Sequence, residues 1–149
     1  MGNNVDKNDL ELLDEAYKNV RMASFAIDCL IEKIENKDLE DLLRKQNRFY
    51  LDTTKVLNRL SKKLKHKPKD ISVFLKTSSF MAIKMKTMMN NDTPKFAQML
   101  VEGTTMGITD TLKAKGEYPS KREDLIEVVD DIVRNEEEFV DSLKKFLES

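Results

Sequence analysis

The stretch that decides the fold is residues 39–64, LEDLLRKQNRFYLDTTKVLNRLSKKL. The positions that recur in it at alternating steps of four and three are Leu39, Leu43, Gln46, Tyr50, Thr53, Leu57, Leu60 and Leu64. Because an α-helix turns once in about 3.6 residues, these positions share one face of a helix. The stretch therefore predicts a long amphipathic helix, with two polar residues, Gln46 and Thr53, on its buried face.

The same rhythm occurs near both ends of the chain. Its positions are Leu10, Leu13, Tyr17, Val20, Ser24, Ile27, Ile31 and Ile34 and, towards the C-terminus, Leu125, Val129, Ile132, Glu136, Phe139, Leu143 and Phe146. Each run again has a polar residue inside it, Ser24 or Glu136. A further helical segment follows Pro94, which suits the first position of a helix. The sequence thus predicts one all-α domain, residues 1–149, built as an antiparallel bundle of four long helices.

Turn signals set the expected helix boundaries. The predicted helices cover about residues 9–36, 38–65, 70–89, 94–115 and 121–147. The third is an additional shorter helix, expected to bridge the second and fourth over one end or side of the bundle. Asn8 or Asp9 is expected to cap the first helix and Thr93 the fourth. Ser120, with Glu123 three residues later, is the pattern of a capping box for the last helix.

The composition excludes several classes of protein. Charged residues make up 36% of the 149 residues, and the chain has four Gly and three Pro, as is typical of helical proteins. No window approaches 18 apolar residues, so no membrane span is expected. The start of the chain lacks the pattern of a signal peptide. A single cysteine, Cys29, cannot form an internal disulfide, and we expect a cytoplasmic protein.

Basic residues gather in the middle of the chain. Residues 62–95 hold nine basic and two acidic residues, although the net charge is only −1. The densest part, Lys62–Lys69, lies at the C-terminal end of a predicted helix, where lysines interact favourably with the helix dipole. No arginine cluster or aromatic platform accompanies it, so no nucleic-acid binding is expected.

Two of the interrupted stripes invite comparison with a metal site. A di-iron bundle carries Glu-x-x-His on two of its helices and one Glu on each of the others. Here the corresponding stretches are Gln46–Phe49 and Glu136–Phe139, so phenylalanine stands at both histidine positions. The sole histidine, His66, lies among lysines at a helix end. The sequence therefore predicts no metal centre, no cofactor and no catalytic residue.

The segment EGTTMGITD, residues 102–110, and the order of the long helices resemble the ferritin-like superfamily. The chain is most similar to small ferritin-like proteins of clostridia and related Firmicutes that lack the di-iron ligands. The resemblance implies a ferritin-like four-helix bundle. It does not carry ferroxidase activity with it, because only Glu136 matches a family metal ligand by position.

Glu136 has three interpretations. It is a structural group held by hydrogen bonds from Gln46, Tyr50 or Arg48, an exposed group where the helices splay, or part of a pocket for a small polar ligand. An ionised, unpaired carboxylate in the interior costs several kcal/mol, so the first interpretation requires a partner or a raised pKa. If it is structural, Glu136→Leu is expected to be neutral or stabilising.

Gly103 and Gly107 lie one turn apart in the predicted helix 94–115. Each costs roughly 1 kcal/mol relative to alanine, so a compensating contact is expected. The first interpretation is a close helix crossing, in which the missing side chains let two backbones approach. The second is a groove or kink at a ligand, and the weak pocket candidates are then Gln46, Tyr50, Gly103, Gly107 and Glu136.

Two sets of apolar residues lie outside the main stripes. The first set is Met81, Met85, Met88 and Met89, whose spacing is that of ordinary core residues. Two alternatives are that their thioethers bind Cu(I), or that they form an adaptable surface for a partner. Met22, Phe25 and Cys29 form a second strip on the first helix. Either the shorter helix covers this strip, or the strip forms the face of a homodimer. Binding of a different protein is a further possibility for the chain.

Two classes of function follow from these residues. The first is a non-catalytic binding or protein-interaction module, in which a ferritin-like bundle has no di-iron centre. The alternative is a small-ligand carrier or enzyme with a pocket around Glu136, Gln46 and Gly103.

Overall fold

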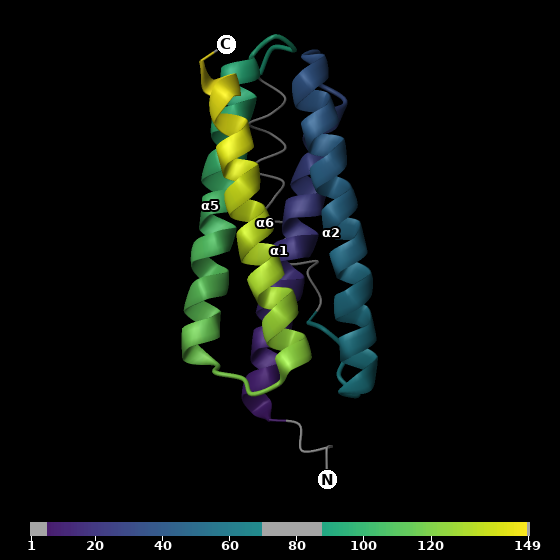
Figure 1. Ribbon diagram of the computed structural model, residues 1–149. Coiled ribbons are helices and arrows are strands. Elements are labelled where there is room, and N and C mark those ends of the chain that lie inside the picture. Colours follow the sequence, from purple (N-terminus) through teal and green to yellow (C-terminus); the bar gives the residue numbers. More distant parts are fainter. Residues whose placement is uncertain (1–5, 70–87, 149) are drawn as a thin grey trace.

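The computed structural model describes residues 6–69 and 88–148. Within these ranges the chain forms helices and no strand, as predicted (Figure 1). The four helices are α1 (Lys7–Ile31), α2 (Lys37–Lys63), α5 (Thr93–Glu117) and α6 (Glu123–Leu147). The expected shorter helix lies outside the described residues except for its last two positions, Met88 and Met89, which are not helical. No helix among the described residues has the length and apolar character needed to cross a membrane.

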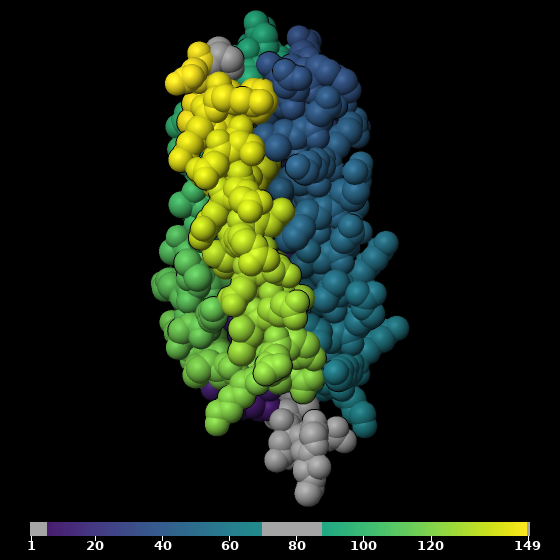
Figure 2. Space-filling model, in the orientation of Figure 1, coloured from purple at the N-terminus to yellow at the C-terminus, as the bar shows by residue number. Residues whose placement is uncertain are grey.

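Each helix packs antiparallel to both of its neighbours. α1 packs against α2 and α5, and α6 packs against the same two helices. α1 and α6 run in one direction and α2 and α5 in the other (Figure 1). As a result α2 ends at one end of the bundle and α5 begins at the opposite end. Figure 2 shows the face on which α6 and α2 lie side by side along the bundle.

The predicted stripes of α2 and α6 are buried in full. All eight stripe positions from Leu39 to Leu64 and all seven from Leu125 to Phe146 are buried, including Gln46, Thr53 and Glu136. The predicted stripe of α1 is only partly buried. Its buried face is wider, because Leu12, Ala16 and Leu30, which lie beside the predicted stripe, are at most 1% exposed.

The helix boundaries differ from the prediction where tertiary contacts compete for the capping groups. Asp6, and not Asn8 or Asp9, caps α1 by accepting a hydrogen bond from the Asn8 N–H at 3.0 Å. α1 ends at Ile31, five residues earlier than predicted, although Ile34 beyond it is still buried. Asn36 then caps α2 by accepting from the Leu39 N–H at 3.0 Å.

The caps predicted for the last two helices were wrong. Thr93 is the first residue of α5, and the carboxylate of the preceding Asp92 turns back to accept from the Met89 N–H at 2.7 Å. α6 begins at Glu123 without a side-chain cap. Ser120 forms no capping box, because α6 begins only at Glu123; the Ser120 hydroxyl donates to the buried Asp9 carboxylate at 2.5 Å and accepts from the Arg122 N–H at 3.1 Å, before the helix starts.

Candidate functional site

The centre of the bundle holds a buried carboxyl group. Glu136, in the middle of α6, is 0% exposed. The Tyr50 hydroxyl on α2 donates to its Oε2 at 2.8 Å, and the Asn19 side-chain amide on α1 donates to its Oε1 at 2.8 Å. Of the predicted partners, Tyr50 is therefore correct. Glu136 is neither exposed nor unpaired.

Gln46 and Arg48 are not partners of Glu136. The Gln46 amide donates instead to the side-chain oxygen of Asn135 on α6 at 2.7 Å. Arg48 is exposed. Gln46 thus joins α2 to α6 beside the carboxyl group, although it does not hydrogen-bond to it.

Asn19 is the functional residue that the sequence analysis missed. Its amide nitrogen bridges two helices, because it also donates to the Thr111 hydroxyl on α5 at 3.0 Å. Asn19 lies outside the main stripe of α1. It does fall in a second row with 3-4 spacing, formed by Leu12, Ala16, Ala23 and Leu30, and a polar residue inside that row was the available signal.

Burial dominates the electrostatics of this cluster. It raises the pKa of Glu136 to about 7, while the hydrogen bonds from Asn19 and Tyr50 act in the opposite direction. Burial, together with the nearby Glu136 carboxylate, also raises the pKa of Tyr50 well above its ordinary value. Tyr50 therefore stays neutral and donates its single hydroxyl hydrogen to Glu136.

The two glycines of α5 have different surroundings. A Cβ added to Gly107 would overlap the side-chain oxygen of Asn19 and lie 3.0 Å from its Cγ. A Cβ added to Gly103 would meet nothing within 4 Å. The predicted close helix crossing was therefore wrong at both positions, because the contact at Gly107 is with a side chain and Gly103 has none.

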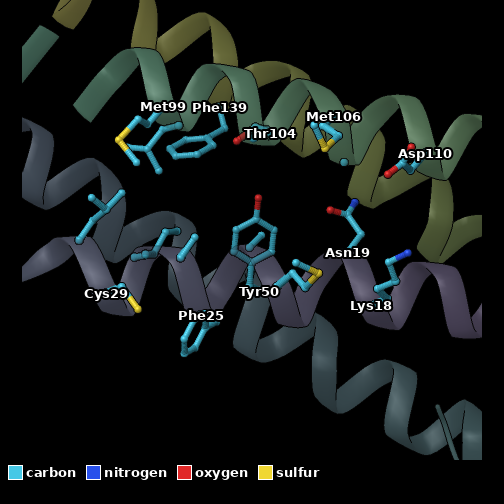
Figure 3. A pocket seen from close by; sticks show the side chains of 18 of the residues that line it. Lys18, Asn19, Phe25, Cys29, Tyr50, Met99, Thr104, Met106, Asp110 and Phe139 are labelled. Atoms are coloured by element: carbon cyan, nitrogen blue, oxygen red, sulfur yellow. The ribbon is translucent and has the colours of Figure 1, made fainter. Parts of the chain in front are cut away.

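A cavity of about 160 Å³ lies between α1 and α5, close to the Glu136 cluster (Figure 3). Most of its lining is apolar, and the larger side chains include Met22, Leu30, Met99, Leu100, Met106 and Phe139. Its polar groups are Asn19, Tyr50 and Thr104, together with three charged side chains, Glu15, Lys18 and Asp110. Three predicted pocket residues, Tyr50, Gly103 and Gly107, line this cavity, whereas Gln46 and Glu136 do not.

The second apolar strip of α1 also borders the cavity. Met22, Phe25 and Cys29 all contribute to its wall and are half-buried. Burial, and to a lesser extent the charge of Asp28, raises the pKa of the Cys29 thiol. Cys29 is therefore an apolar wall residue and not an activated nucleophile.

The ligand chemistry of the cluster does not match a metal pair. Within residues 6–69 and 88–148, no three His, Cys, Asp or Glu side chains come together in a way that could hold a metal ion. Phe139, at the position where a di-iron bundle places histidine, is 3% exposed and lies in the core. His66 instead bonds to Asp14 on α1 at 2.9 Å.

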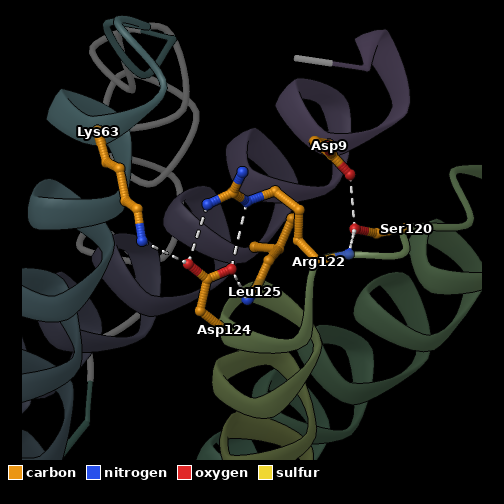
Figure 4. Close-up of polar contacts among 6 residues, drawn as sticks. All are labelled: Asp9, Lys63, Ser120, Arg122, Asp124 and Leu125. Carbon is orange, nitrogen blue, oxygen red and sulfur yellow. Dashed lines mark hydrogen bonds and ion pairs between the residues drawn. The ribbon is translucent and has the colours of Figure 1, made fainter. Parts of the chain in front are cut away.

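The basic run Lys62–Lys69, at the C-terminal end of α2, makes contacts with acidic groups of other helices. Lys63 lies 3.4 Å from Asp124 near the start of α6 (Figure 4). Arg122 binds both oxygens of the same carboxylate, at 3.2 and 3.0 Å. Burial alone would raise the pKa of Asp124, but these contacts outweigh it and lower that pKa. Lys69 likewise lies 3.5 Å from Glu11 of α1.

No protein-family model, curated protein or solved structure matches the chain.

Proposed function

We propose that this chain is a non-catalytic binding protein, built on a ferritin-like bundle without a di-iron centre, whose small ligand occupies the cavity between α1 and α5. The observation that carries this proposal is the cavity itself. Its lining is largely apolar, it reaches the core residues Tyr50 and Phe139, and it includes a few polar side chains. Small-molecule sites in proteins commonly have this character.

The helix directions support the ferritin-like part of the proposal. α2 and α5 run in the same direction, so the chain between them has to connect opposite ends of the bundle (Figure 1). Ferritin-like folds have one such long crossover connection, whereas simple up-down-up-down bundles have none.

The hydrogen bonds of Glu136 support a binding role over a catalytic one. Both of its oxygens accept hydrogen bonds from fixed protein groups, Tyr50 and Asn19. A general base has to come within hydrogen-bond reach of the substrate, directly or through one water. Glu136 does not line the cavity, and its role in this proposal is to hold α1, α2 and α6 around it.

The volume of the cavity indicates the size of the ligand. Engineered cavities of about 150 Å³ lined by Leu, Ile and Phe bind benzene, whereas drug-sized ligands need about 300 Å³ or more. A cavity of about 160 Å³ therefore suits a molecule the size of a single aromatic ring or a short branched chain.

A titration of ¹⁵N-labelled protein with toluene tests the proposal. We expect saturable shifts of backbone amide signals from α1 and α5 that surround the cavity. Gly103→Leu should abolish these shifts, because Gly103 lies one turn from Met99 and near Met106 on the cavity-lining face. The matched control is Gly116→Leu, since Gly116 is also helical and open but does not line the cavity. Absence of saturable binding to the unmodified protein would overturn the proposal.

A further inference from the structure

A basic hollow lies at the C-terminal end of α2 and shares no lining residue with the cavity between α1 and α5. It is open to the surface and has a volume of about 500 Å³. Its lining includes Asn58, Ser61, His66 and three lysines, Lys62, Lys65 and Lys67, which we call the hollow lysines. None of the lining residues is acidic. A concave surface with charges of one sign attracts and concentrates counter-ions, so this hollow favours an anion.

The five lysines of the run Lys62–Lys69 fall into two groups. Lys63 and Lys69 contact acidic groups of other helices, at 3.4 Å from Asp124 and 3.5 Å from Glu11 (Figure 4). The hollow lysines are all exposed, and their ammonium groups make no ion pair or hydrogen bond with residues 6–69 or 88–148. Contacts within the bundle therefore account for only two of the five lysines.

The end of α2 does not need the hollow lysines as hydrogen-bond donors. The carbonyl groups of Ser61 and Lys62, in the last turn, accept from the backbone N–H groups of His66 and Lys65, at 2.9 and 3.1 Å. Backbone bonds of this kind close many helix C-termini. The three ammonium groups are thus left to interact with solvent or with a bound anion.

One hollow lysine has an unfavourable backbone conformation. Lys65 has a φ of 52°, and within the described part of the chain it is the one residue other than glycine with a positive φ. It directly follows Leu64, the C-cap of α2, at the position where glycine is most common in helix ends. A Cβ is unfavourable there, so glycine would suit the fold better than lysine. The lysine instead adds a third positive charge to the hollow.

Two further polar side chains line the hollow. Asn58 lies one turn before Lys62 on the same face of α2, and its amide can donate to an anion beside that ammonium group. His66 is held in place by a hydrogen bond of 2.9 Å between its Nε2 and the buried Asp14 carboxylate. The wall of the hollow is therefore fixed against α1 on one side.

We propose that this hollow binds a small phosphate compound, through a phosphate group with two or more negative charges that lies among the hollow lysines and accepts from Asn58. Lysine binds phosphate as a point charge, without the planar pairing that arginine provides. A multivalent anion offsets the repulsion among three ammonium groups, which a monovalent anion does only in part. The lining has no Phe, Tyr or Trp on which nucleobases could stack, so a single-stranded nucleic acid is not favoured. This site is separate from the cavity and does not depend on the function proposed above.

The probe is inorganic pyrophosphate, titrated into ¹⁵N-labelled protein at about 0.15 M salt, where distant charges are largely screened. We expect saturable shifts of the amide signals of residues 58–67, and no saturable shifts with acetate. Lys62→Gln, Lys65→Gln and Lys67→Gln should each weaken binding about two- to fivefold, the effect of one exposed ion pair. The triple variant should show no saturable binding.

The matched control replaces three exposed lysines outside the hollow, Lys45, Lys95 and Lys113, by glutamine. It removes the same net charge and should change the affinity for pyrophosphate by less than about twofold, because those charges are screened. Lys65→Gly separates binding from folding. It should raise the midpoint of urea denaturation, because glycine suits the positive φ, and still weaken pyrophosphate binding.

Three results would overturn the proposal. An equal loss of affinity in both triple variants would show that only the net charge matters. Unchanged pyrophosphate binding in Lys65→Gly would remove the role of that lysine, and saturable binding of acetate would remove the preference for a multivalent anion. Tighter binding of single-stranded oligothymidylate than of pyrophosphate would identify the partner as a nucleic acid and exclude a small phosphate compound.

Discussion

Gly107 on α5 lies against the side-chain amide of Asn19 on α1, so closely that no Cβ fits between the backbone and that amide. The same amide donates to Glu136 on α6 and to Thr111 one turn after Gly107. A missing side chain on one helix thereby makes room for the residue that satisfies a buried carboxyl group on another.

Gly107→Ala should destabilise the protein. The new Cβ displaces Asn19, and the loss of its hydrogen bond leaves a buried Glu136 oxygen without a partner, at a cost of about 1–3 kcal/mol. Better helix propensity offsets roughly 1 kcal/mol of this. We therefore expect a net decrease of about 1–2 kcal/mol in the free energy of unfolding, measured by urea denaturation.

Two glycines of the same helix serve as controls for that substitution. Gly103 and Gly116 have nothing within 4 Å of an added Cβ. Gly103→Ala and Gly116→Ala should each increase the free energy of unfolding by up to about 1 kcal/mol. An increase of the same size in Gly107→Ala would show that Asn19 moves without cost and would contradict its proposed fixed position.

The stability of the folded state should depend on pH through Glu136. Burial raises the pKa of this group from 4.5 to about 7, so the folded protein binds the proton more tightly than the unfolded chain. Its contribution to stability is complete below pH 4.5 and is lost as the pH rises through 7. The total change is about 3 kcal/mol, at 1.36 kcal/mol for each pKa unit.

Glu136→Gln removes this dependence while it keeps an oxygen to accept from Asn19. Between pH 5 and pH 8, the stability of the variant relative to the unmodified protein should rise by about 2–3 kcal/mol. Urea denaturation of both proteins at both pH values gives this difference, in which the other titrating groups cancel. Parallel pH profiles of the two proteins would rule out a raised pKa at position 136.

Glu136→Leu should destabilise the bundle, contrary to the expectation from sequence alone. The leucine cannot accept hydrogen bonds, and the Tyr50 hydroxyl and the Asn19 amide lose their partner inside the core. Each unsatisfied group costs about 1–3 kcal/mol. Adding Tyr50→Phe removes one of these groups and should recover about 1 kcal/mol or more. If thermal unfolding shows the double variant to be no more stable than Glu136→Leu, the Tyr50 hydroxyl does not need Glu136 as its hydrogen-bond acceptor.

Loss of the buried Asp14 carboxylate should destabilise the protein more than loss of the half-buried Glu11 carboxylate one turn earlier. Asp14 is 6% exposed and accepts hydrogen bonds from His66 at 2.9 Å and from the Lys69 N–H at 3.2 Å. Asp14→Ala leaves these groups without an acceptor and should cost about 1–3 kcal/mol. Glu11→Ala removes only the exposed contact with Lys69 and should cost at most about 0.5 kcal/mol. Equal effects of the two substitutions in urea denaturation would contradict this assignment.

The sequence predicted the buried faces of α2 and α6 completely, because each of these helices presents a single stripe to the interior. α1 was harder to predict, since it packs against two neighbours and buries a wider face that includes Leu12 and Ala16. The position of Glu136 could be predicted from spacing. Its second partner, Asn19, was missed: the polar residue inside the second row of α1 indicates burial, but its pairing with Glu136 depends on how α1 is rotated against α6.

The helix caps failed for a related reason. A capping motif is a local pattern, and it holds only if no distant group competes for the same hydroxyl. The Ser120 hydroxyl donates to Asp9, 111 positions away in the chain, and accepts from the Arg122 N–H, so it is held in the turn and α6 begins only at Glu123. The choice of Gly107 over Gly103 as the essential glycine had no local signal either, because both stand in similar helical sequence.

The Glu136 cluster draws on all four described helices at one level. Asn19 and Tyr50 are the middle residues of α1 and α2, and Glu136 and Thr111 join them from α6 and α5. Apolar stripes that repeat every three or four residues can slide past one another by a turn, about 5.4 Å, and still match. A single layer of polar residues cannot shift by a turn in this way, because the shift would break all of its hydrogen bonds at once. The cluster thus selects one axial register for the bundle, as a single buried asparagine does in a coiled coil.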